Sequence, residues 1–372
     1  MDWLTAAEAL ALLGTQPQTL YANVSRGRIK ARPDPADSRR SLYRGDDVRR
    51  MAGRTGGRRR QETVAVEAMQ WGEPVLRTAI STVRAGRLIY RGQDASRLSQ
   101  IATFEAAAAL LWQSPVILPA APAAGQGMAG AFAALAAEAA NAPPAPRSAA
   151  ALAADAALVL ATLAQCLAPG AAEAPLHLRL ALHWRRPDAA ESIRRALVLL
   201  ADHELNASAF AARVTVSTGA SLWAGALAGL ATLRGPHHGL ASPEVSALAQ
   251  DVGHAGDRTE PLLREWLGEG RYLPGMGHKL YPDGDIRCQT LLEAFAPPPQ
   301  FAAYCAAARA ISGDEPNIDF ALAALAAAFE LPGDAGITVF ALARSAGWLA
   351  HMSEQILSGE RIRPRGRYVG PD

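Results

Sequence analysis

The sequence predicts a mainly α-helical protein, with a small separate domain of helices and short strands at its N-terminus. From Val64 onward, apolar residues recur at spacings of three and four, and Gly or Pro separates the runs. Charge distinguishes the two parts, because residues 1–60 carry thirteen Lys or Arg against six Asp or Glu, whereas the rest of the chain has a net charge of −5. The chain has 372 residues, of which 50% are hydrophobic, so it can bury a large core in two or three domains.

Residues 1–52 are predicted to form a winged helix-turn-helix domain. Thr5 and Glu8 form a Thr-x-x-Glu capping box, which predicts the start of the first helix. A second helix is expected to begin near Thr15, with a Pro in its first turn. Two short strands around a turn and a third helix from near Asp46 complete the predicted domain.

This arrangement resembles the DNA-reading head of the MerR and excisionase families, in which the second helix enters the major groove and the wing contacts the backbone. The resemblance implies DNA contacts for a set of polar and basic residues: Gln18, Thr19, Asn23, Arg26, Arg28 and Arg40. A basic surface that only mediates protein contacts fits the same composition, so both interpretations stay open. Residues 53–61 combine Gly with like charges and are expected to form a flexible linker.

The body is expected to begin with a β-hairpin over the segment ISTVRAGRLIYRG and to continue as helices. Residues 106–137 carry no charge, but Pro115 and Pro119 are among the residues that interrupt this run, so it is not one membrane-spanning helix and no membrane partner is expected. Ala-rich stretches between residues 118 and 175 keep an apolar stripe that fits thin, closely packed helices.

A further helical pattern covers residues 196–233 and leads into the loop GPHHG. We expect this helix to carry His203, Asn206 and Ser208, with the first two on one face. A buried His satisfied by the backbone is the alternative for His203 taken alone.

The residues best suited to carbonyl chemistry lie between residues 233 and 320, in loops or at helix edges beside Gly and Pro. His238, His278 and Asp319 supply two imidazoles and a carboxylate, enough for one general base and two groups that polarise carbonyl oxygens. Arg287 and Arg344 could add a cationic clamp for carboxylates. Three Cys without metal-type spacing predict neither a disulfide framework nor a zinc site, and no other metal set is expected.

Six segments, in the order found in the family, resemble the signature segments of citrate synthases. GPHHG is similar to the family's GPxHGG, PGMGHKLYPDGDIR to GFGHRVY followed by D-x-R, and PNIDF to PNVDF. DHELNAS, ARSAGWLAHMSEQ and RIRPRGRYVG are similar to the helix with a substrate-binding His, to the closing helix and to the RPR tail. The similarity begins near Leu76 and covers roughly four-fifths of the chain. It implies an all-helical large domain of residues 62–239 and 331–372 and a small domain of residues 240–330, which close over a cleft.

The resemblance implies a Claisen-type condensation of acetyl-CoA with oxaloacetate, followed by hydrolysis of citryl-CoA to citrate and CoA. Asp319 would remove a methyl proton from acetyl-CoA, His238 would bind the thioester oxygen as charge develops, and His278 would polarise the keto group. The implied oxaloacetate-binding residues are His203, Asn206, Arg287, Arg344 and, from a second subunit, Arg363, with Ser208 in support. The implied coenzyme A contacts are Leu273, Gly275, Gly277 and Lys279.

The same resemblance implies a homodimer that works without a metal or a permanently bound cofactor, with coenzyme A entering only as acetyl-CoA. The N-terminus lacks a basic-then-apolar signal pattern, so a cytoplasmic location is expected.

Three functions remain open at this point. The first is a citrate synthase or the closely similar 2-methylcitrate synthase, which uses propionyl-CoA. The second is a DNA-binding regulator whose body senses CoA esters or oxaloacetate, and the third is a structural protein whose head mediates assembly. Leu240, Ser242, Met276 and Lys279 depart from the family pattern near the predicted coenzyme A side, which leaves the choice of acyl group open.

Overall fold

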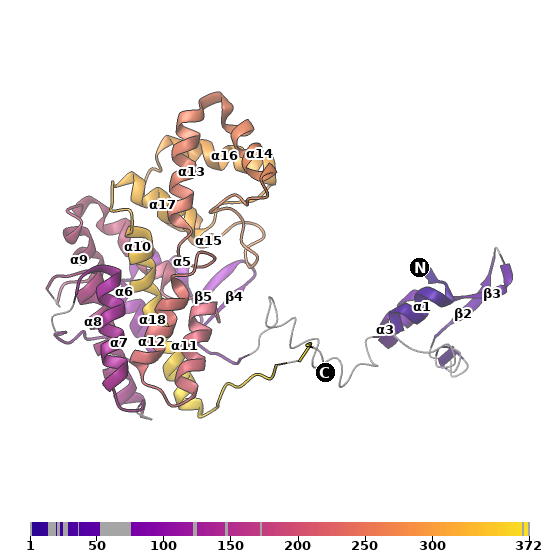
Figure 1. Cartoon of the computed structure of the whole chain (residues 1–372), viewed down its shortest axis with the longest axis horizontal. Helices are drawn as coiled ribbons and strands as arrows, with labels where there is room; N and C mark the ends of the chain where they lie inside the picture. The colour runs from indigo at the N-terminus through magenta and orange to yellow at the C-terminus, as the bar shows by residue number, and fades with distance from the viewer. Residues whose placement is uncertain are drawn as a thin grey trace. The chain divides into compact units, whose positions relative to one another are not determined.

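The computed structural model describes residues 2–13, 20, 23–24, 29–35, 37–52, 76–121, 125–145, 148–171, 173–366 and 368–370. The chain forms two compact units, residues 1–77 and 78–372 (Figure 1). The predicted linker, residues 53–61, lies outside the described residues.

The N-terminal unit combines short helices with a three-stranded antiparallel sheet. Its elements are β1 (Trp3–Leu4), α1 (Ala6–Leu13), β2 (Ala31–Asp34), β3 (Asp37–Arg44) and α3 (Gly45–Ala52). The predicted capping box is confirmed, because the Thr5 N–H donates to Glu8 Oε2 at 2.8 Å and the Glu8 N–H donates to Thr5 Oγ1 at 3.3 Å. The predicted pair of strands is also present, since β2 lies antiparallel to β3, with β1 on the other side of β3. A small core holds the unit together, formed by Ala9, Leu13, Leu20, Ile29, Tyr43 and Val48.

Most of the predicted second helix lies outside the described residues. The same holds for most of the predicted DNA contacts: Gln18, Thr19, Arg26, Arg28 and the side chain of Arg40. Asn23 is described and is partly buried, and its carbonyl accepts a hydrogen bond from the Ile29 N–H at 3.4 Å. A DNA-binding role of this unit therefore stays a prediction.

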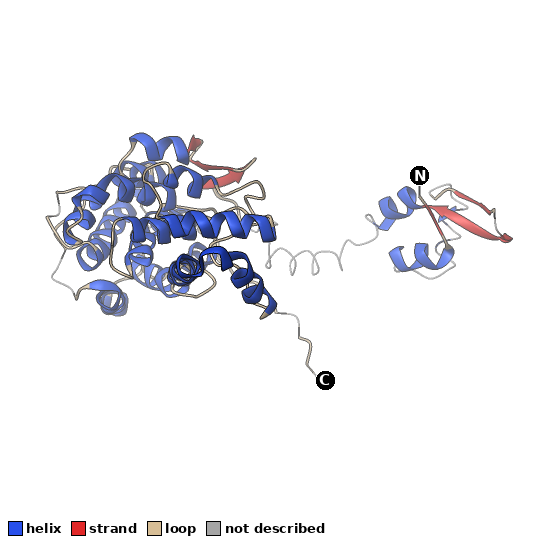
Figure 2. Cartoon of the chain, turned by 90° about the horizontal axis from the view of Figure 1, so that it is seen from above, coloured by secondary structure: helices blue, strands red, loops and turns tan. Residues whose placement is uncertain are grey.

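The body is built almost entirely from helices, and its strands form one small antiparallel sheet (Figure 2). The strands are β4 (Ser81–Arg84), β5 (Arg87–Tyr90) and β6 (Gln93–Asp94). The first helices are α5 (Ala95–Ile101), α6 (Phe104–Trp112), α7 (Gly127–Asn141), α8 (Ala149–Leu167), α9 (Leu176–His183), the 3₁₀ turn η1 (Pro187–Ala189), α10 (Ala190–Leu200), α11 (Ala207–Ser217) and α12 (Leu222–Leu233). The later helices are α13 (Ser242–Ala255), the 3₁₀ turn η2 (Gly256–Arg258), α14 (Thr259–Gly268), α15 (Ile286–Leu292), α16 (Pro299–Ser312), α17 (Ile318–Ala328) and α18 (Ala335–Ser358).

The structure confirms the mainly α-helical body and the predicted hairpin. In the hairpin, β4 pairs with β5 so that Ser81 lies opposite Tyr90 and Arg84 opposite Arg87. The Ala-rich region also forms helices, α7 and α8, which pack on each other. Helix α8 is long and apolar enough to cross a membrane. However, 61% of its most apolar 18-residue stretch is buried inside the body, which fits a core helix.

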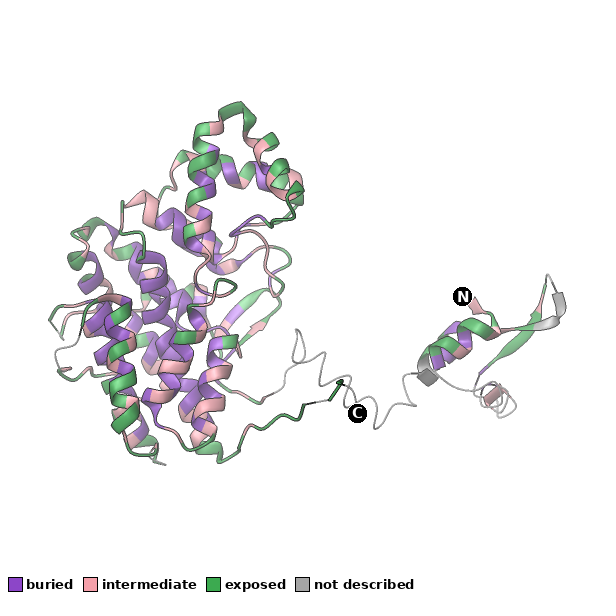
Figure 3. Ribbon diagram, in the orientation of Figure 1, coloured by how far each residue is buried: buried purple, intermediate pink, exposed green. Residues whose placement is uncertain are grey.

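Helix α18 is the central element of the body. It packs against α6, α8, α10, α11 and α12 (Figure 1), and most of its residues are buried (Figure 3). Small residues allow this close packing. A Cβ at Gly229 of α12 would lie 2.9 Å from the Trp348 ring, so this position leaves room for the indole.

Four of the later helices form a group, in which α13 contacts α14, α16 and α17, and α14 contacts α16. Helix α15 lies between this group and the rest of the body, since it contacts both α17 and α10. The group falls within the predicted small domain, residues 240–330, but the domain boundaries and a closing motion stay predictions.

The expected single helix over residues 196–233 is wrong. Helix α10 ends at Leu200, α11 begins at Ala207, and a new helix, α12, follows, so His203 and Asn206 lie in the segment between two helices. A tertiary contact explains the break: the Gly347 N–H of α18 donates to the Ala201 carbonyl at 2.9 Å. A Cβ at Gly347 would lie 2.2 Å from Asp202 Oδ1, so only Gly lets the segment approach α18 this closely.

Candidate active site

The structure brings most of the predicted site residues together from separate elements of the body. His203 and Asn206 lie between α10 and α11, His238 lies between α12 and α13, and His278 lies in the long segment before α15. Arg287, Asp319 and Arg344 lie in the first turn of α15, in the first turn of α17 and in the middle of α18. They form one electrostatic cluster, because, beside burial, the charges of Arg287 and Arg344 act on the pKa of both His203 and Asp319.

His238 is held by a polar network that starts from α11. Its Nε2 lies 2.9 Å from Ser208 Oγ, which also accepts a hydrogen bond from Trp348 Nε1 at 3.0 Å and donates to Asn206 Oδ1 at 2.7 Å. The neighbouring His237 is exposed. Burial, and secondly the charge of Arg344, lower the pKa of His238 to about 4, so the imidazole is neutral at pH 7.

Asn206 has a positioning role in this structure. Its Oδ1 caps α11 by accepting from the Ala209 N–H at 3.1 Å, and its Nδ2 donates to the carbonyls of His203 and Glu204. The side chain therefore ties the segment before α11 to the helix and to Ser208.

His278 begins a tight turn that also fixes its ring. The Tyr281 N–H donates to the His278 carbonyl at 2.9 Å, and the Leu280 N–H donates to His278 Nδ1 at 3.1 Å. Since Nδ1 accepts a hydrogen, the ring of a neutral His278 carries its own hydrogen on Nε2. Burial, and secondly the charge of Arg287, lower the pKa of His278 to about 4, so at pH 7 this ring is a neutral hydrogen-bond donor.

His203 is buried beside Tyr281 and His278. Its Nε2 lies 2.9 Å from the Tyr281 hydroxyl, and its ring meets the ring of His278 edge to face at 5.3 Å between centroids. Burial and the positive charges of Arg287 and Arg344 hold the pKa of His203 well below its usual range. The site thus contains three imidazoles that are uncharged at neutral pH.

Arg287 is clamped by a carboxylate two residues earlier. Asp285 accepts from Arg287 Nε at 2.9 Å and from Arg287 Nη2 at 2.7 Å, and both side chains are buried. The same Asp285 accepts from the Ile318 N–H at 3.0 Å, which fixes the start of α17 relative to Arg287. Burial opposes the charge of Arg287, but Asp285 outweighs it and raises the pKa of the guanidinium.

Arg344 is buried with one part of its guanidinium unused. Its Nε donates to the Leu200 carbonyl at 2.9 Å, whereas Nη2 is buried and has no hydrogen-bond partner among the described residues. Burial lowers the pKa of Arg344 to about 10, which still leaves it charged at pH 7. A buried cation with an unsatisfied donor is suited to bind an anion such as a carboxylate.

Asp319 is the second residue of α17. Its N–H is capped by Asn317 Oδ1 at 3.0 Å, and its own Oδ1 is buried without a hydrogen-bond partner in the described part of the chain. Burial is the main reason that the pKa of Asp319 rises to about 7, against the attraction of Arg287 and Arg344. A carboxylate with this pKa and a free oxygen is suited to act as a general base at neutral pH.

The segment predicted to contact coenzyme A is docked against the start of α17. The Gly277 N–H donates to the Glu315 carbonyl at 2.8 Å, and the Asn317 N–H donates to the Gly275 carbonyl at 2.8 Å. Gly275 has a φ of +75°, and a Cβ there would lie 2.7 Å from Val245 and 3.1 Å from Phe320. This docking joins the residues just before His278 to the residues just before Asp319, while Leu273 is buried and Lys279 is exposed.

Arg363 stands apart from the other predicted residues. It lies in the tail after α18 and is exposed. The tail is attached near its base, where Gln355 Nε2 donates to the Glu360 carbonyl at 2.7 Å and the Ile362 N–H donates to Ser217 Oγ at 3.2 Å. Its predicted use in a partner's site stays a prediction.

Four residues that the sequence analysis did not single out support the site: Asp202, Tyr281, Asp285 and Trp348. Asp202 and Asp285 stand next to or near predicted residues in the motifs DHELN and DGDIR, so their proximity in sequence was an available signal. Trp348 stands in the motif ARSAGWLAHMSEQ, four residues after Arg344, but its contact with Ser208 depends on the fold.

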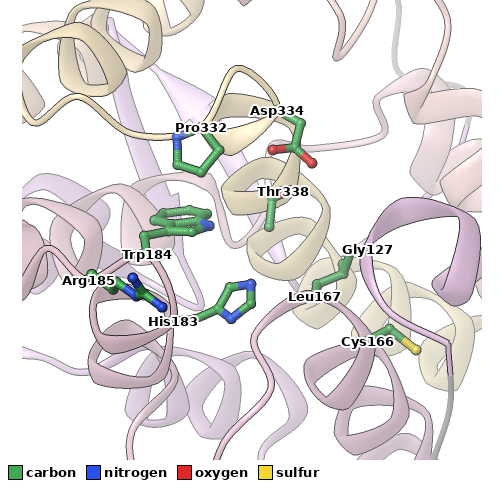
Figure 4. Close-up of a pocket in the computed structure, with 9 residues that line it drawn as sticks. All are labelled: Gly127, Cys166, Leu167, His183, Trp184, Arg185, Pro332, Asp334 and Thr338. Carbon is green, nitrogen blue, oxygen red and sulfur yellow. The ribbon is translucent and has the colours of Figure 1, made fainter.

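A surface cavity of about 380 Å³ lies elsewhere in the body, where α8 and α9 end and α18 begins (Figure 4). His183, Trp184 and Asp334 are among the residues that line it, and none of the predicted catalytic or substrate-binding residues does. Among the described residues, no group of three or more His, Cys, Asp or Glu could hold a metal ion. The candidate active site is therefore identified by its cluster of titratable side chains, and not by this cavity or by a metal site.

Comparisons with known proteins identify the family to which the chain is similar. A family model of the citrate synthase C-terminal domain matches residues 117–365. Citrate synthase 2 of Bacillus subtilis is 35% identical over 196 residues, which make up 50% of this chain and 52% of that protein. The chain thus spans about half the length of the curated relatives it matches.

Solved structures share the fold. Citrate synthase from Thermotoga maritima aligns with a TM-score of 0.68 and 24% identity, over 81% of this chain and 94% of that chain. Citrate synthase from Thermoplasma acidophilum, solved as a ternary complex with carboxymethyl coenzyme A and oxaloacetate, aligns with a TM-score of 0.64 and 21% identity, over 82% of this chain and 96% of that chain. Since the family model matches more than half of its residues, the chain belongs to the citrate synthase family.

Proposed function

We propose that this protein condenses acetyl-CoA with oxaloacetate and releases citrate and CoA. The observation that carries the proposal is the state of Asp319, whose Oδ1 is buried without a hydrogen-bond partner among the described residues and whose pKa burial raises to about 7. A ligand sensor needs no general base, because binding involves no proton transfer. Deprotonation of a thioester methyl group requires such a base.

The neutral imidazoles fit the carbonyl side of this reaction. Asp319 Oδ1 takes a proton from the methyl carbon, and His238 stabilises the negative charge that develops on the thioester oxygen. For this, His238 needs its hydrogen on Nδ1, which requires the Ser208 hydroxyl to turn its single hydrogen from Asn206 Oδ1, its acceptor at 2.7 Å in the free protein, to His238 Nε2. The new carbon–carbon bond forms at the keto carbon of oxaloacetate, whose oxygen is polarised by the Nε2–H of His278. Water then cleaves the citryl thioester.

The cations fit the two carboxylates of oxaloacetate. Arg344 offers its buried Nη2, which has no hydrogen-bond partner among the described residues, and Arg287 is fixed in place by Asp285. The complex of the Thermoplasma acidophilum enzyme with carboxymethyl coenzyme A and oxaloacetate supports this choice of substrates. We further propose that Arg363 completes the site from a second subunit, which makes the active form a homodimer.

One assay tests the proposal: release of free CoA thiol from acetyl-CoA by the purified full-length protein in the presence and absence of oxaloacetate. We expect turnover that depends on oxaloacetate. Propionyl-CoA in place of acetyl-CoA distinguishes the alternative, 2-methylcitrate synthase, which would show the higher kcat/KM with the longer acyl group. Protein that binds both substrates without releasing CoA would contradict the proposed function.

A further inference from the structure

The residues that follow His278 form a compact turn that reaches both imidazoles on the oxaloacetate side of the site. The turn spans residues 278–281 and is closed by the hydrogen bond from the Tyr281 N–H to the His278 carbonyl. Its third residue, Leu280, donates to His278 Nδ1, and its fourth residue, Tyr281, places a hydroxyl 2.9 Å from His203 Nε2. A single turn therefore contacts one ring nitrogen of each imidazole.

Tyr281 is held firmly enough to orient its partner. The side chain is 2% exposed, and its ring packs against both imidazoles, with centroids 5.6 Å from His203 and 5.0 Å from His278. The guanidinium of Arg287 lies 5.2 Å from the centre of the same ring. These contacts leave the phenol little freedom to move away from His203.

The direction of the hydrogen bond between Tyr281 and His203 follows from the partners available. A buried hydroxyl gives its hydrogen to an acceptor, and within the described residues the one partner of the Tyr281 hydroxyl is His203 Nε2. The phenol keeps its hydrogen at neutral pH, because burial raises the pKa of Tyr281. His203 Nε2 is then an acceptor, and the hydrogen of the neutral ring is on Nδ1.

We propose that Tyr281 is a positioning residue that holds His203 as the Nδ1–H tautomer, so that His203 donates this hydrogen to oxaloacetate. This inference rests on the proposed function for the identity of the substrate, but the tautomer is a property of the free protein. It assigns the two rings complementary states, with His278 donating through Nε2–H and His203 through Nδ1–H. An isolated neutral imidazole prefers its hydrogen on Nε2, so without the hydroxyl His203 would lose the preference for the donor form.

The test is nitrogen NMR of the ligand-free full-length protein labelled with ¹⁵N-His, recorded at neutral pH. The chain has eight His, and the signals of His203 are assigned as those missing from the His203→Gln variant. We expect the parent to show His203 with a protonated Nδ1 and an unprotonated Nε2. The opposite pattern, with the hydrogen on Nε2, overturns the inference whether or not the protein turns over.

The Tyr281→Phe variant removes the hydroxyl and keeps the ring, so its packing is preserved. We expect the His203 signals to shift toward the Nε2–H form, while those of His278 stay unchanged because the Leu280 N–H still holds its Nδ1. The kcat is expected to fall about tenfold or more, with the KM for acetyl-CoA within about twofold of the parent. Tyr43→Phe, at a buried tyrosine of the N-terminal unit, is the matched control and is expected to change none of these quantities.

Two further outcomes are decisive. If Tyr281→Phe leaves both the tautomer and kcat unchanged, the hydroxyl does not position His203 and the inference is wrong. If the parent has the expected tautomer but releases no CoA, the arrangement of Tyr281 and His203 stands and the proposed function fails instead.

Discussion

His351 Nε2 lies 3.2 Å from Asp202 Oδ2, and neither side chain is exposed to solvent. On the other side of the ring, Arg213 Nη1 donates to His351 Nδ1 at 3.2 Å. Because a guanidinium can only donate, Nδ1 carries no hydrogen, and the ring is neutral with its hydrogen on Nε2 toward Asp202. Asp202 directly precedes His203, so α18 and α11 together anchor the segment that brings His203 into the site.

Replacing His351 should show how much this anchor contributes. We expect His351→Leu to lower the free energy of unfolding by about 3 to 5 kcal/mol, because it leaves Asp202 and Arg213 buried with fewer partners. His351→Gln should cost clearly less, since a glutamine amide can donate to Asp202 and accept from Arg213. Urea unfolding of the two variants beside the parent measures both values. Equal stability of all three proteins would show that the network contributes nothing.

Asp319→Asn tests the proposed base directly. The amide keeps the size of the side chain but cannot accept the methyl proton, so we expect kcat to fall by about a thousandfold or more. Oxaloacetate affinity should survive, because the Arg and His residues assigned to it are unchanged. Steady-state kinetics and calorimetric titration with oxaloacetate measure the two effects separately. An Asp319→Asn enzyme as fast as an active parent would remove Asp319 from the mechanism.

The pH profile of the parent follows from the same group. Asp319 acts as a base only when ionised, and its pKa of about 7 means that most of it is protonated at pH 6. We therefore expect kcat/KM to be level above about pH 8 and to fall about tenfold per unit as the pH drops below 7. His238 and His278, with pKa values of about 4, stay neutral over this range and add no second step above pH 5. A profile that is flat from pH 5 to 8 under conditions where chemistry limits the rate would contradict this assignment.

Arg344→Ala should affect binding and rate together. It removes the buried guanidinium whose Nη2 is available for a carboxylate, so we expect a loss of about 2 to 5 kcal/mol in oxaloacetate affinity as well as slower turnover. Arg344→Lys is the matched variant, because it keeps the charge but loses the fixed planar geometry, and it should lie between the parent and Arg344→Ala. Affinity is measured by titration with oxaloacetate alone. An unchanged affinity in Arg344→Ala would show that this residue does not bind the substrate.

The sequence predicted local features well, because their causes lie within a few residues. The capping box of Thr5 and Glu8 is one example, and the hairpin from Ser81 to Tyr90 is another. The break between α10 and α11 was missed for the opposite reason. The helical pattern continues through it, and the cause is the close approach of Ala201 and Asp202 to Gly347, which lies far away in the sequence.

The candidate site shows the same division. His238, His278, Asp319 and the two Arg were identified because the motifs around them resemble a known family. Tyr281 stands in one of those motifs, yet its contact with His203 depends on how two distant segments meet, so no spacing rule could reveal it. Asp319 Oδ1 and Arg344 Nη2 are buried without a hydrogen-bond partner in the described part of the chain, and burial is a property that a sequence pattern does not report.

The proposed exchange of Arg363 between subunits can be tested by mixing two inactive chains. Arg363→Ala lacks the shared cation, and Asp319→Asn lacks the base, so each homodimer should be slow. In a mixed dimer, the subunit with an intact Asp319 receives Arg363 from its partner, which restores one complete site and leaves the other with both defects. Random pairing of equal amounts makes about half of the dimers mixed, so co-expression should recover about a quarter of the parent rate. Separately purified chains assayed side by side are the control. If Arg363 serves its own chain, neither type of subunit in a mixed dimer has a complete site, and co-expression recovers nothing.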